Sequence, residues 1–201
     1  MRVAFGLKPH SGWAALVGLG LRHGDLHVIA RSRIELVEKT DASWAKQPYH
    51  AAKRSMGNAS DVVRRGVESA RRIAVREMRS AVERAREAGH EVGACAVLVV
   101  DPMPGWTVDE ILAVHFRMHK AEGVLFRDAL IRAADACRVP SVAIVEKHLR
   151  QQAERALGTS MKRFQKAIAS LGKTVGAPWG ADQKDAALAA LIALRRKRSV
   201  A

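Results

Sequence analysis

Residues with the chemistry of metal ligands lie along one face of a predicted helix. His115, His119 and Glu122 occupy positions i, i+4 and i+7 of a helical segment at residues 108–137, and this spacing can bind Zn²⁺ from one side of a helix. The residues do not form the His-Glu-x-x-His motif of zinc enzymes, and no further histidine lies nearby in the sequence to complete the set. A packed or solvated helix face is therefore the alternative interpretation.

Carboxylates stand at the ends of two other predicted elements. Asp182 and Asp185 lie three residues apart at the start of a helix at residues 181–196, so both side chains can reach the same point. Asp101 directly follows an apolar run at residues 94–100. Each position also has a purely structural explanation, because acidic side chains stabilise a helix N-terminus and an Asp before a proline can simply end a strand.

Basic side chains form a stripe along the longest predicted helix, at residues 60–88. The arginines follow one another at steps of seven, four, three and seven: Arg65, Arg72, Arg76, Arg79 and Arg86. A continuous cationic stripe of this kind can follow a nucleic-acid backbone. The glutamates of the same helix make an ordinary solvated face an equal alternative: Glu68, Glu77, Glu83 and Glu87.

The connection at residues 38–60 mixes aromatic and basic side chains, a combination that stacks bases while it holds phosphates. The residues concerned are Trp44, Lys46, Tyr49, Lys53 and Arg54. Trp106 adds an aromatic side chain in a second loop. All three aromatic residues are equally explained as local hydrophobic anchors.

The composition narrows the classes of protein that could use these residues. The chain has 201 residues and 48% hydrophobic residues, enough for a buried core. The excess of 34 Lys and Arg over 20 Asp and Glu gives a net charge of +14, which favours a nucleic-acid partner, DNA in first place, over a mere solubility device.

No apolar run approaches the roughly 18–20 residues that cross a membrane, and no secretion signal opens the sequence. Two cysteines, Cys95 and Cys137, are too few for a disulfide scaffold and are expected to be reduced and buried. We expect a cytoplasmic protein without a membrane partner.

The elements that must position these residues alternate between strand and helix. The predicted strands lie at residues 2–8, 12–20, 26–37, 94–100 and 141–145, and the predicted helices lie at residues 60–88, 108–137 with an interruption near Gly123, 147–157, 160–171 and 181–196. Short connections make the first three strands an antiparallel meander, and the strand–helix units that follow add parallel strands. The fold class is therefore α/β, a ribonuclease H-like mixed sheet with helices on both faces. We expect a single domain at residues 1–201, with an elaborated connection at residues 38–60 and a basic tail at residues 195–201.

The order of the motifs resembles one family in particular. Residues 6–13, Gly-Leu-Lys-Pro-His-Ser-Gly-Trp, resemble the opening Gly-Ile-Asp-Pro-Gly-Ser of RuvC-like Holliday junction resolvases, and residues 182–189 resemble their closing Asp-x-x-Asp-Ala-x-Ala element. Residues 122–140 resemble the long helix of that family and the start of the next strand. The resemblance runs through the whole chain in order, with extra length between residues 38 and 60.

The resemblance implies a site for phosphodiester hydrolysis by two metal ions, which needs carboxylates from several elements. Asp101, Asp182 and Asp185 are then the catalytic and metal-binding candidates, with Mg²⁺ or Mn²⁺ as the cofactor if the protein is active. Trp106 would lie in the loop that places an aromatic residue at the junction, and a two-fold homodimer is implied as the partner state.

Lys8 departs from the family pattern. The family has an aspartate at this position, whereas a lysine ammonium is protonated near neutral pH and repels a divalent cation. It can itself neutralise a carboxylate and so replace a metal ion. His10 also replaces a glycine of the family, and Lys8 and His10 then become candidates for contact with nucleic acid.

Three hypotheses follow for the function. The first is a nucleic-acid-binding protein of RuvC-like fold with a degenerate metal site, which binds branched or structured DNA without cutting it. The second is a divergent metal-dependent endonuclease, similar to a junction resolvase, that uses Asp101, Asp182 and Asp185. The third is an adaptor or scaffold protein that keeps only the fold.

Overall fold

A five-stranded mixed sheet forms the centre of the computed structural model, which describes residues 1–55 and 57–196. The strand order is β3-β2-β1-β4-β5, with β1–β2 and β2–β3 antiparallel and β1–β4 and β4–β5 parallel. The strands are β1 Arg2–His10, β2 Trp13–Arg22, β3 Asp25–Glu35, β4 Glu91–Val99 and β5 Ser141–Val145. This topology confirms the predicted antiparallel meander followed by parallel strands.

Tight turns produce the meander. Only Ser11 and Gly12 separate β1 from β2, and only His23 and Gly24 separate β2 from β3. Gly12 and Gly24 have φ values of +83° and +87°, a region that glycine enters without steric cost. The two hairpins therefore return the chain with neighbouring strands in register.

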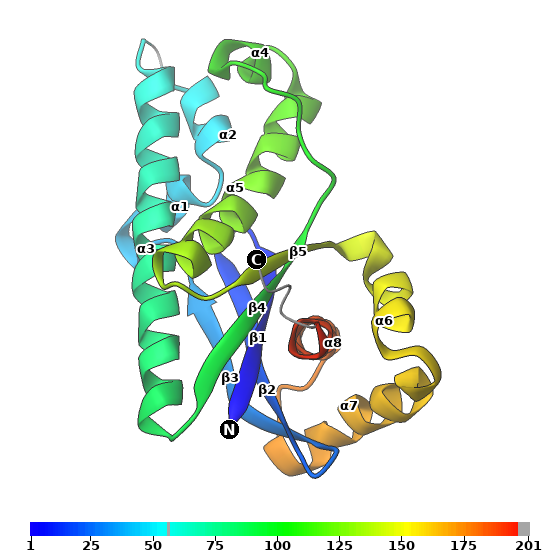
Figure 1. Cartoon of the computed structure of the whole chain (residues 1–201). Helices are drawn as coiled ribbons and strands as arrows, with labels where there is room; N and C mark the ends of the chain where they lie inside the picture. The colour runs from blue at the N-terminus through cyan, green and yellow to red at the C-terminus, as the bar shows by residue number, and fades with distance from the viewer. Residues whose placement is uncertain (56, 197–201) are drawn as a thin grey trace.

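Two helical layers cover the sheet (Figure 1). Helices α3 Ala59–Glu87 and α5 His115–Ala136 pack on one face, and α8 Ala181–Arg195 packs on the other. Helices α6 Leu149–Leu157 and α7 Met161–Val175 lie outside α8 and cover it. The described residues contain no helix that combines the length and apolar character needed to cross a membrane.

Two predictions need correction: the position of the break in one helix and the burial of one cysteine. The helix expected at residues 108–137 is two helices, α4 Val108–Leu112 and α5, and it is interrupted at Ala113 and Val114 and not at Gly123. Val114 has an extended backbone that starts a new helix, whereas a single glycine inside a long packed helix is tolerated. Cys95 is buried as expected, but Cys137 is only half-buried; both are free thiols.

The elaborated connection contains more regular structure than expected. It forms the short helices η1 Lys39–Asp41, α1 Ala42–Ala45 and α2 Pro48–Lys53. Proline suits the first position of a helix because its missing N–H would have no partner there. Helix α2 packs closely on α3, since a Cβ at Gly66 would lie 2.6 Å from the Cβ of Pro48. The connection is thereby held against the α3 and α5 layer.

Helix α8 is buried on all sides over most of its length. Every residue from 186 to 193 is buried, as expected for a helix enclosed between a sheet and other helices. Its approach to β1 is very close: a Cβ at Gly6 would collide with the carbonyl oxygen of Ala186 and lie 2.7 Å from the backbone nitrogen of Ala190. The absence of a side chain at Gly6 therefore sets the distance between the strand and the helix.

We expect Gly6→Ala to lower the free energy of unfolding by about 1–3 kcal/mol, the usual cost of overpacking a core. The added methyl group meets backbone atoms, which cannot rotate away. Chemical denaturation measures the change. Gly123→Ala is the matched control: its nearest neighbour would be 3.9 Å away, so the same substitution within helix α5 is expected to stabilise by about 0.5–1 kcal/mol. Equal effects of the two variants would contradict the close packing at Gly6.

Candidate functional site

The face of β1 that packs on α8 also carries Lys8. Side chains alternate between the two faces of a strand, so Lys8 shares the face of Ala4 and Gly6. Because Gly6 lets α8 approach closely, the first turn of α8 lies beside the end of β1. Asp182 and Asp185 belong to the start of that helix. The packing of the helix on the strand thus brings two carboxylates to the lysine.

Lys8 lies at the centre of a group of three carboxylates. Its Nζ is 2.6 Å from Asp185 Oδ2, 3.1 Å from Glu146 Oε1 and 3.5 Å from Asp182 Oδ1. The side chain of Lys8 is only 11% exposed, so its charge is largely removed from water. We call Lys8, Glu146, Asp182 and Asp185 the Lys8 cluster.

The acidic partners keep the ammonium charged. Burial by itself lowers the pKa of Lys8, but hydrogen bonds to Asp185 and Glu146 and the charges of these two residues outweigh burial. The net result is a pKa of Lys8 above its ordinary value. The centre of the cluster therefore holds a positive charge throughout the neutral pH range.

Glu146 is a member of this cluster that sequence analysis missed. It is the first residue after β5 and begins η2 Glu146–His148. The carboxyl ends of parallel strands meet at one edge of a sheet, so an acidic residue directly after the apolar run 141–145 was the available indication. Arg127 Nη2 lies 3.9 Å from the second oxygen of Glu146 and adds another positive charge.

His10 extends the cluster along β1. Its Nε2 lies 3.1 Å from Asp182 Oδ2. The ring stacks on Trp13, with centroids 4.3 Å apart and an interplanar angle of 13°. The guanidinium of Arg33 covers Trp13 at 3.9 Å from the ring centroid. His10 is thus held between a carboxylate and an aromatic ring.

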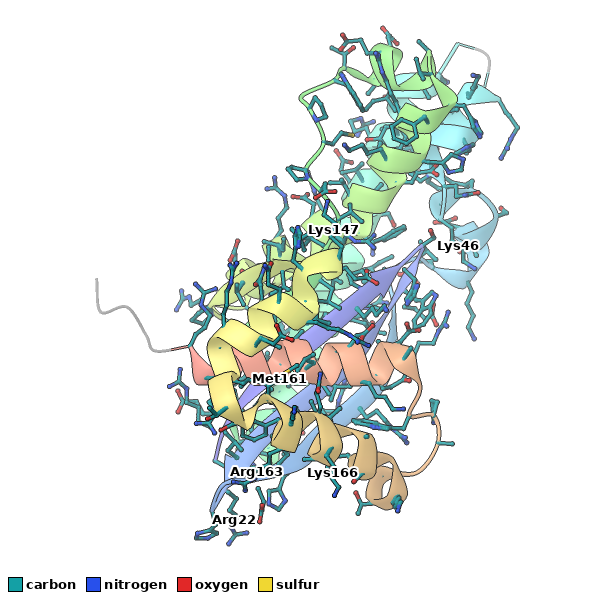
Figure 2. The ribbon with its side chains drawn as sticks, turned by 90° about the vertical axis from the view of Figure 1, so that its right-hand side faces the viewer. Arg22, Lys46, Lys147, Met161, Arg163 and Lys166 are labelled. Carbon is teal, nitrogen blue, oxygen red and sulfur yellow. The ribbon has the colours of Figure 1, made fainter. Side chains whose placement is uncertain are left out.

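Asp101 lies near the Lys8 cluster but is paired elsewhere. It shares a cleft of about 560 Å³ with Glu146 and Asp185, at the carboxyl ends of β4 and β5. Its Oδ2 accepts a hydrogen bond of 2.6 Å from Lys147 Nζ, and this bond together with the nearby positive charges lowers the pKa of Asp101. Lys147 is labelled in Figure 2. The metal-binding role of Asp101 stays a prediction, and its position contributes to the cleft and not to the Lys8 cluster.

The arginine stripe lies on α3, in the layer opposite α8. All five side chains are exposed or partly exposed: Arg65, Arg72, Arg76, Arg79 and Arg86. Arg76 is engaged by Glu38 at 2.9 Å and by Glu77 at 3.0 Å. Arg72 and Arg79 line an open groove together with Glu83. The stripe is thus on the surface, and part of its charge is compensated locally.

The aromatic candidates differ in their exposure. Tyr49 is buried and therefore cannot stack on bases, so the alternative of a hydrophobic anchor is correct for this residue. Trp44 and Trp106 are half-buried against the core, and arginines cover their rings: Arg65 at 5.5 Å and Arg117 at 4.7 Å. Lys46, Lys53 and Arg54 are exposed. In the basic tail, residues 197–201 lie outside the described residues.

His115, His119 and Glu122 were predicted as possible metal ligands on one helix face. In the structure, a residue from another helix takes the place of Glu122 in this set. His115 and His119 lie side by side, but the third histidine beside them is His50 of α2, which no spacing in the sequence connects with them. Glu122 binds His50 and does not join the two histidines directly. No residue of this histidine group belongs to the Lys8 cluster.

The residues present do not fit the two-ion centre that the resemblance implies. The Lys8 ammonium alone would repel a divalent cation about 4 Å away by about 8 kcal/mol at an effective dielectric constant of about 20, which offsets the attraction of about one carboxylate at the same distance. The carboxylates that would bind it are already paired with Lys8. One ammonium against three carboxylates leaves the group partly neutralised and still acidic, and the ammonium occupies the point between the carboxylates where a cation would lie.

Comparison with solved structures identifies the fold. A structure of Thermus thermophilus RuvC in complex with Holliday junction substrate aligns with 96% of this chain and 92% of its own, with 14% sequence identity and a TM-score of 0.50. A second Thermus thermophilus RuvC structure aligns with 94% of this chain and 92% of its own, with 14% identity and a TM-score of 0.49. No protein-family model matches the sequence, and no curated protein sequence matches it. The chain therefore has the RuvC-like version of the ribonuclease H-like fold.

We expect Lys8→Met to lower the free energy of unfolding by about 1–3 kcal/mol, because three carboxylates lose their central cation. The value is below that of a fully buried ion pair, since these carboxylates are about one-third exposed. Mn²⁺ should raise the melting temperature of the variant and not that of the wild type, because only the variant leaves room for a cation. Thermal denaturation with and without Mn²⁺ measures both effects.

Lys184→Met is the control for Lys8→Met. Lys184 is exposed or partly exposed near the start of α8, so the change in charge is identical but no cluster is broken. For the wild type, the raised pKa of Lys8 means that its contribution to stability is fully present below the ordinary lysine pKa of about 10.4 and is lost only at higher pH. A stabilising effect of Mn²⁺ on the wild type would contradict the interpretation that the Lys8 ammonium occupies the position of a metal ion.

Proposed function

We propose that this chain binds branched or otherwise structured DNA and does not cleave it. The observation that carries the proposal is the position of Lys8 Nζ, within 3.5 Å of carboxylates from three different positions of the chain. A divalent metal ion would have to displace this ammonium before it could act on a phosphodiester. Binding of DNA without cleavage requires no such ion.

Two further observations support a DNA partner. The net charge of +14 favours a polyanion. A solved structure with the same fold is that of Thermus thermophilus RuvC in complex with Holliday junction substrate. A four-way junction is thus the first substrate to try.

The cleft beside the Lys8 cluster is the surface that we propose for the DNA backbone. Lys147 and Arg150 line it, and the positive charges of Lys147, His148 and Lys120 act on Asp101 at its edge. Phosphates are attracted by such a rim, and the buried ammonium of Lys8 reduces the repulsion between the acidic floor and the phosphates. The Arg33–Trp13–His10 stack stands beside the same floor and offers an aromatic edge.

We expect Lys147→Gln with Arg150→Gln to weaken junction binding about tenfold or more and to reduce the slope of log K against log salt by about two, one for each phosphate that the variant no longer neutralises. Fluorescence anisotropy with a labelled four-way junction at several salt concentrations measures both quantities.

Lys162→Gln with Lys166→Gln is the matched control on α7, where Figure 2 shows Lys166 at the other end of this face from Lys147. Equal losses in the two double variants would argue against the cleft, and a wild type that binds neither junction, duplex nor single strand at low salt would refute DNA binding.

Cleavage assays separate this proposal from the endonuclease alternative. The wild type should leave the junction intact in Mg²⁺ or Mn²⁺, whereas Lys8→Asp should gain metal-dependent nicking, because the substitution converts the central cation into a further carboxylate ligand. The gained activity should disappear in Lys8→Asp with Asp182→Ala. Metal-dependent nicking by the wild type that Asp182→Ala abolishes would instead establish a divergent endonuclease.

A further inference from the structure

A second group of side chains lies apart from the Lys8 cluster, where α2 meets the first turns of α5. His50 belongs to α2, and His115 and His119 belong to α5. Within the part of the chain that the structure describes, these histidines form the one group of three metal-ligating residues whose ligand atoms all lie within 4.8 Å of one another. We propose that His50, His115 and His119 bind a Zn²⁺ ion that joins α2 to α5, with Glu122 as the carboxylate that orients His50.

The positions of the histidine rings suit one shared ion. His115 Nε2 and His119 Nε2 are 3.0 Å apart, and two nitrogens bound to one tetrahedral zinc ion at 2.0–2.1 Å lie about 3.3 Å apart. The ring of His50 lies 5.1 Å from that of His115 and 4.7 Å from that of His119. Because His115 and His119 are exposed, small rotations of their side chains are enough to complete the coordination.

Glu122 fixes which nitrogen of His50 faces the other histidines. Its carboxylate oxygens lie 2.9 Å and 2.8 Å from His50 Nδ1, and the backbone N–H of His50 donates to Oε1 at 3.1 Å. In the tautomer that donates Nδ1–H to this carboxylate, Nε2 has the lone pair that a metal ion requires. A ligand histidine held by a carboxylate in this way is the usual arrangement around protein-bound zinc.

The burial of Glu122 is otherwise costly. Its side chain is only 4% exposed, and it is the one buried charged residue among those described. A buried carboxylate needs hydrogen bonds and a compensating positive charge. His50 supplies the hydrogen bonds, and a divalent ion on the far side of the same imidazole would supply the charge. A metal-binding role thus explains a residue that packing alone does not.

The donor set selects the kind of ion. Imidazole nitrogens suit Zn²⁺ and related transition metals, whereas Mg²⁺ and Ca²⁺ require oxygen ligands. Three protein ligands leave a fourth tetrahedral position, which faces solvent because His115 and His119 are exposed. The ion would attach the connection at residues 38–60 to the helix that follows the α4–α5 interruption. This site shares no residue with the Lys8 cluster, so its test is independent of the proposed function.

Zinc binding by tag-free protein tests the proposal, with a chromophoric chelator as the competitor. We expect one Zn²⁺ per chain, bound about a hundredfold more tightly by the wild type than by His119→Ala or His115→Ala. Glu122→Gln should weaken binding about 10–100-fold because the orienting carboxylate is removed. Co²⁺ in place of Zn²⁺ should give the intense visible absorption of a tetrahedral site in the wild type and not in His119→Ala.

His27→Ala is the matched control, because His27 is an exposed histidine on β3, away from the group. It should bind Zn²⁺ as the wild type does. The variants His115→Ala and His119→Ala change exposed residues and should keep the circular dichroism spectrum of the wild type, and His119→Gln provides a second variant that keeps a polar side chain in the helix. Zinc affinity that is the same in the wild type and His119→Ala would overturn the proposal, and the 3.0 Å contact between His115 and His119 would then be a hydrogen bond between the two rings.

Discussion

The contact between β1 and α8 at Gly6 is the constraint on which the candidate site depends. The backbones approach so closely that no side chain fits between them, and Ala186 and Ala190 present the smallest surfaces on the helix side. This contact fixes the position of the first turn of α8 relative to the end of β1. The charged residues of that turn then meet Lys8, two residues beyond Gly6 on the same face of the strand. The ion cluster is thus a consequence of apolar packing, and not its cause.

Lysine and a metal ion solve the same electrostatic problem differently. Three carboxylates at one sheet edge repel one another, and either kind of cation reduces that repulsion. A bound ion can leave, exchange with other ions and accept phosphate oxygens as ligands. The ammonium of a lysine is covalently attached to the chain and does none of these. Arg127 adds a positive charge beside Glu146, and the ring of His10 lies beside Asp182. In this structure the Lys8 ammonium therefore holds the three acidic residues together.

Much of the fold could be predicted because local patterns and global packing agree. The apolar runs 94–100 and 141–145 are too short and too continuous for surface helices, and the glycine turns of the meander make its consecutive strands neighbours. Lys8, Asp182 and Asp185 could be assigned to one site because a resemblance placed them in a known topology. The connection at residues 38–60 was less informative, because its structure depends on contacts with α3 and α5, as between Pro48 and Gly66.

The residues that were missed share one property: only the tertiary structure gives them their partners. Glu146 follows a predicted strand, but its carboxylate matters because Lys8 is on the next strand but one of the sheet. His50 is separated from Glu122 by 72 positions in the sequence and lies in a segment without periodicity. Asp101 shows the opposite case, since its position was predicted at the correct sheet edge but Lys147, two residues after β5, takes its charge. The sequence thus predicted where the acidic residues lie in the fold better than it predicted which residues they pair with.

The central position of α8 has a consequence for how the chain acquires its structure. This helix follows all the strands in the sequence, yet it fills the middle of one of the two apolar layers. During synthesis the sheet emerges first with that face uncovered, and the contact between Gly6 and Ala186 closes a loop of most of the chain. Contacts of such sequence separation are slow to form. The apolar sheet face that α8 covers therefore lacks this cover until residues 181–195 have been synthesised.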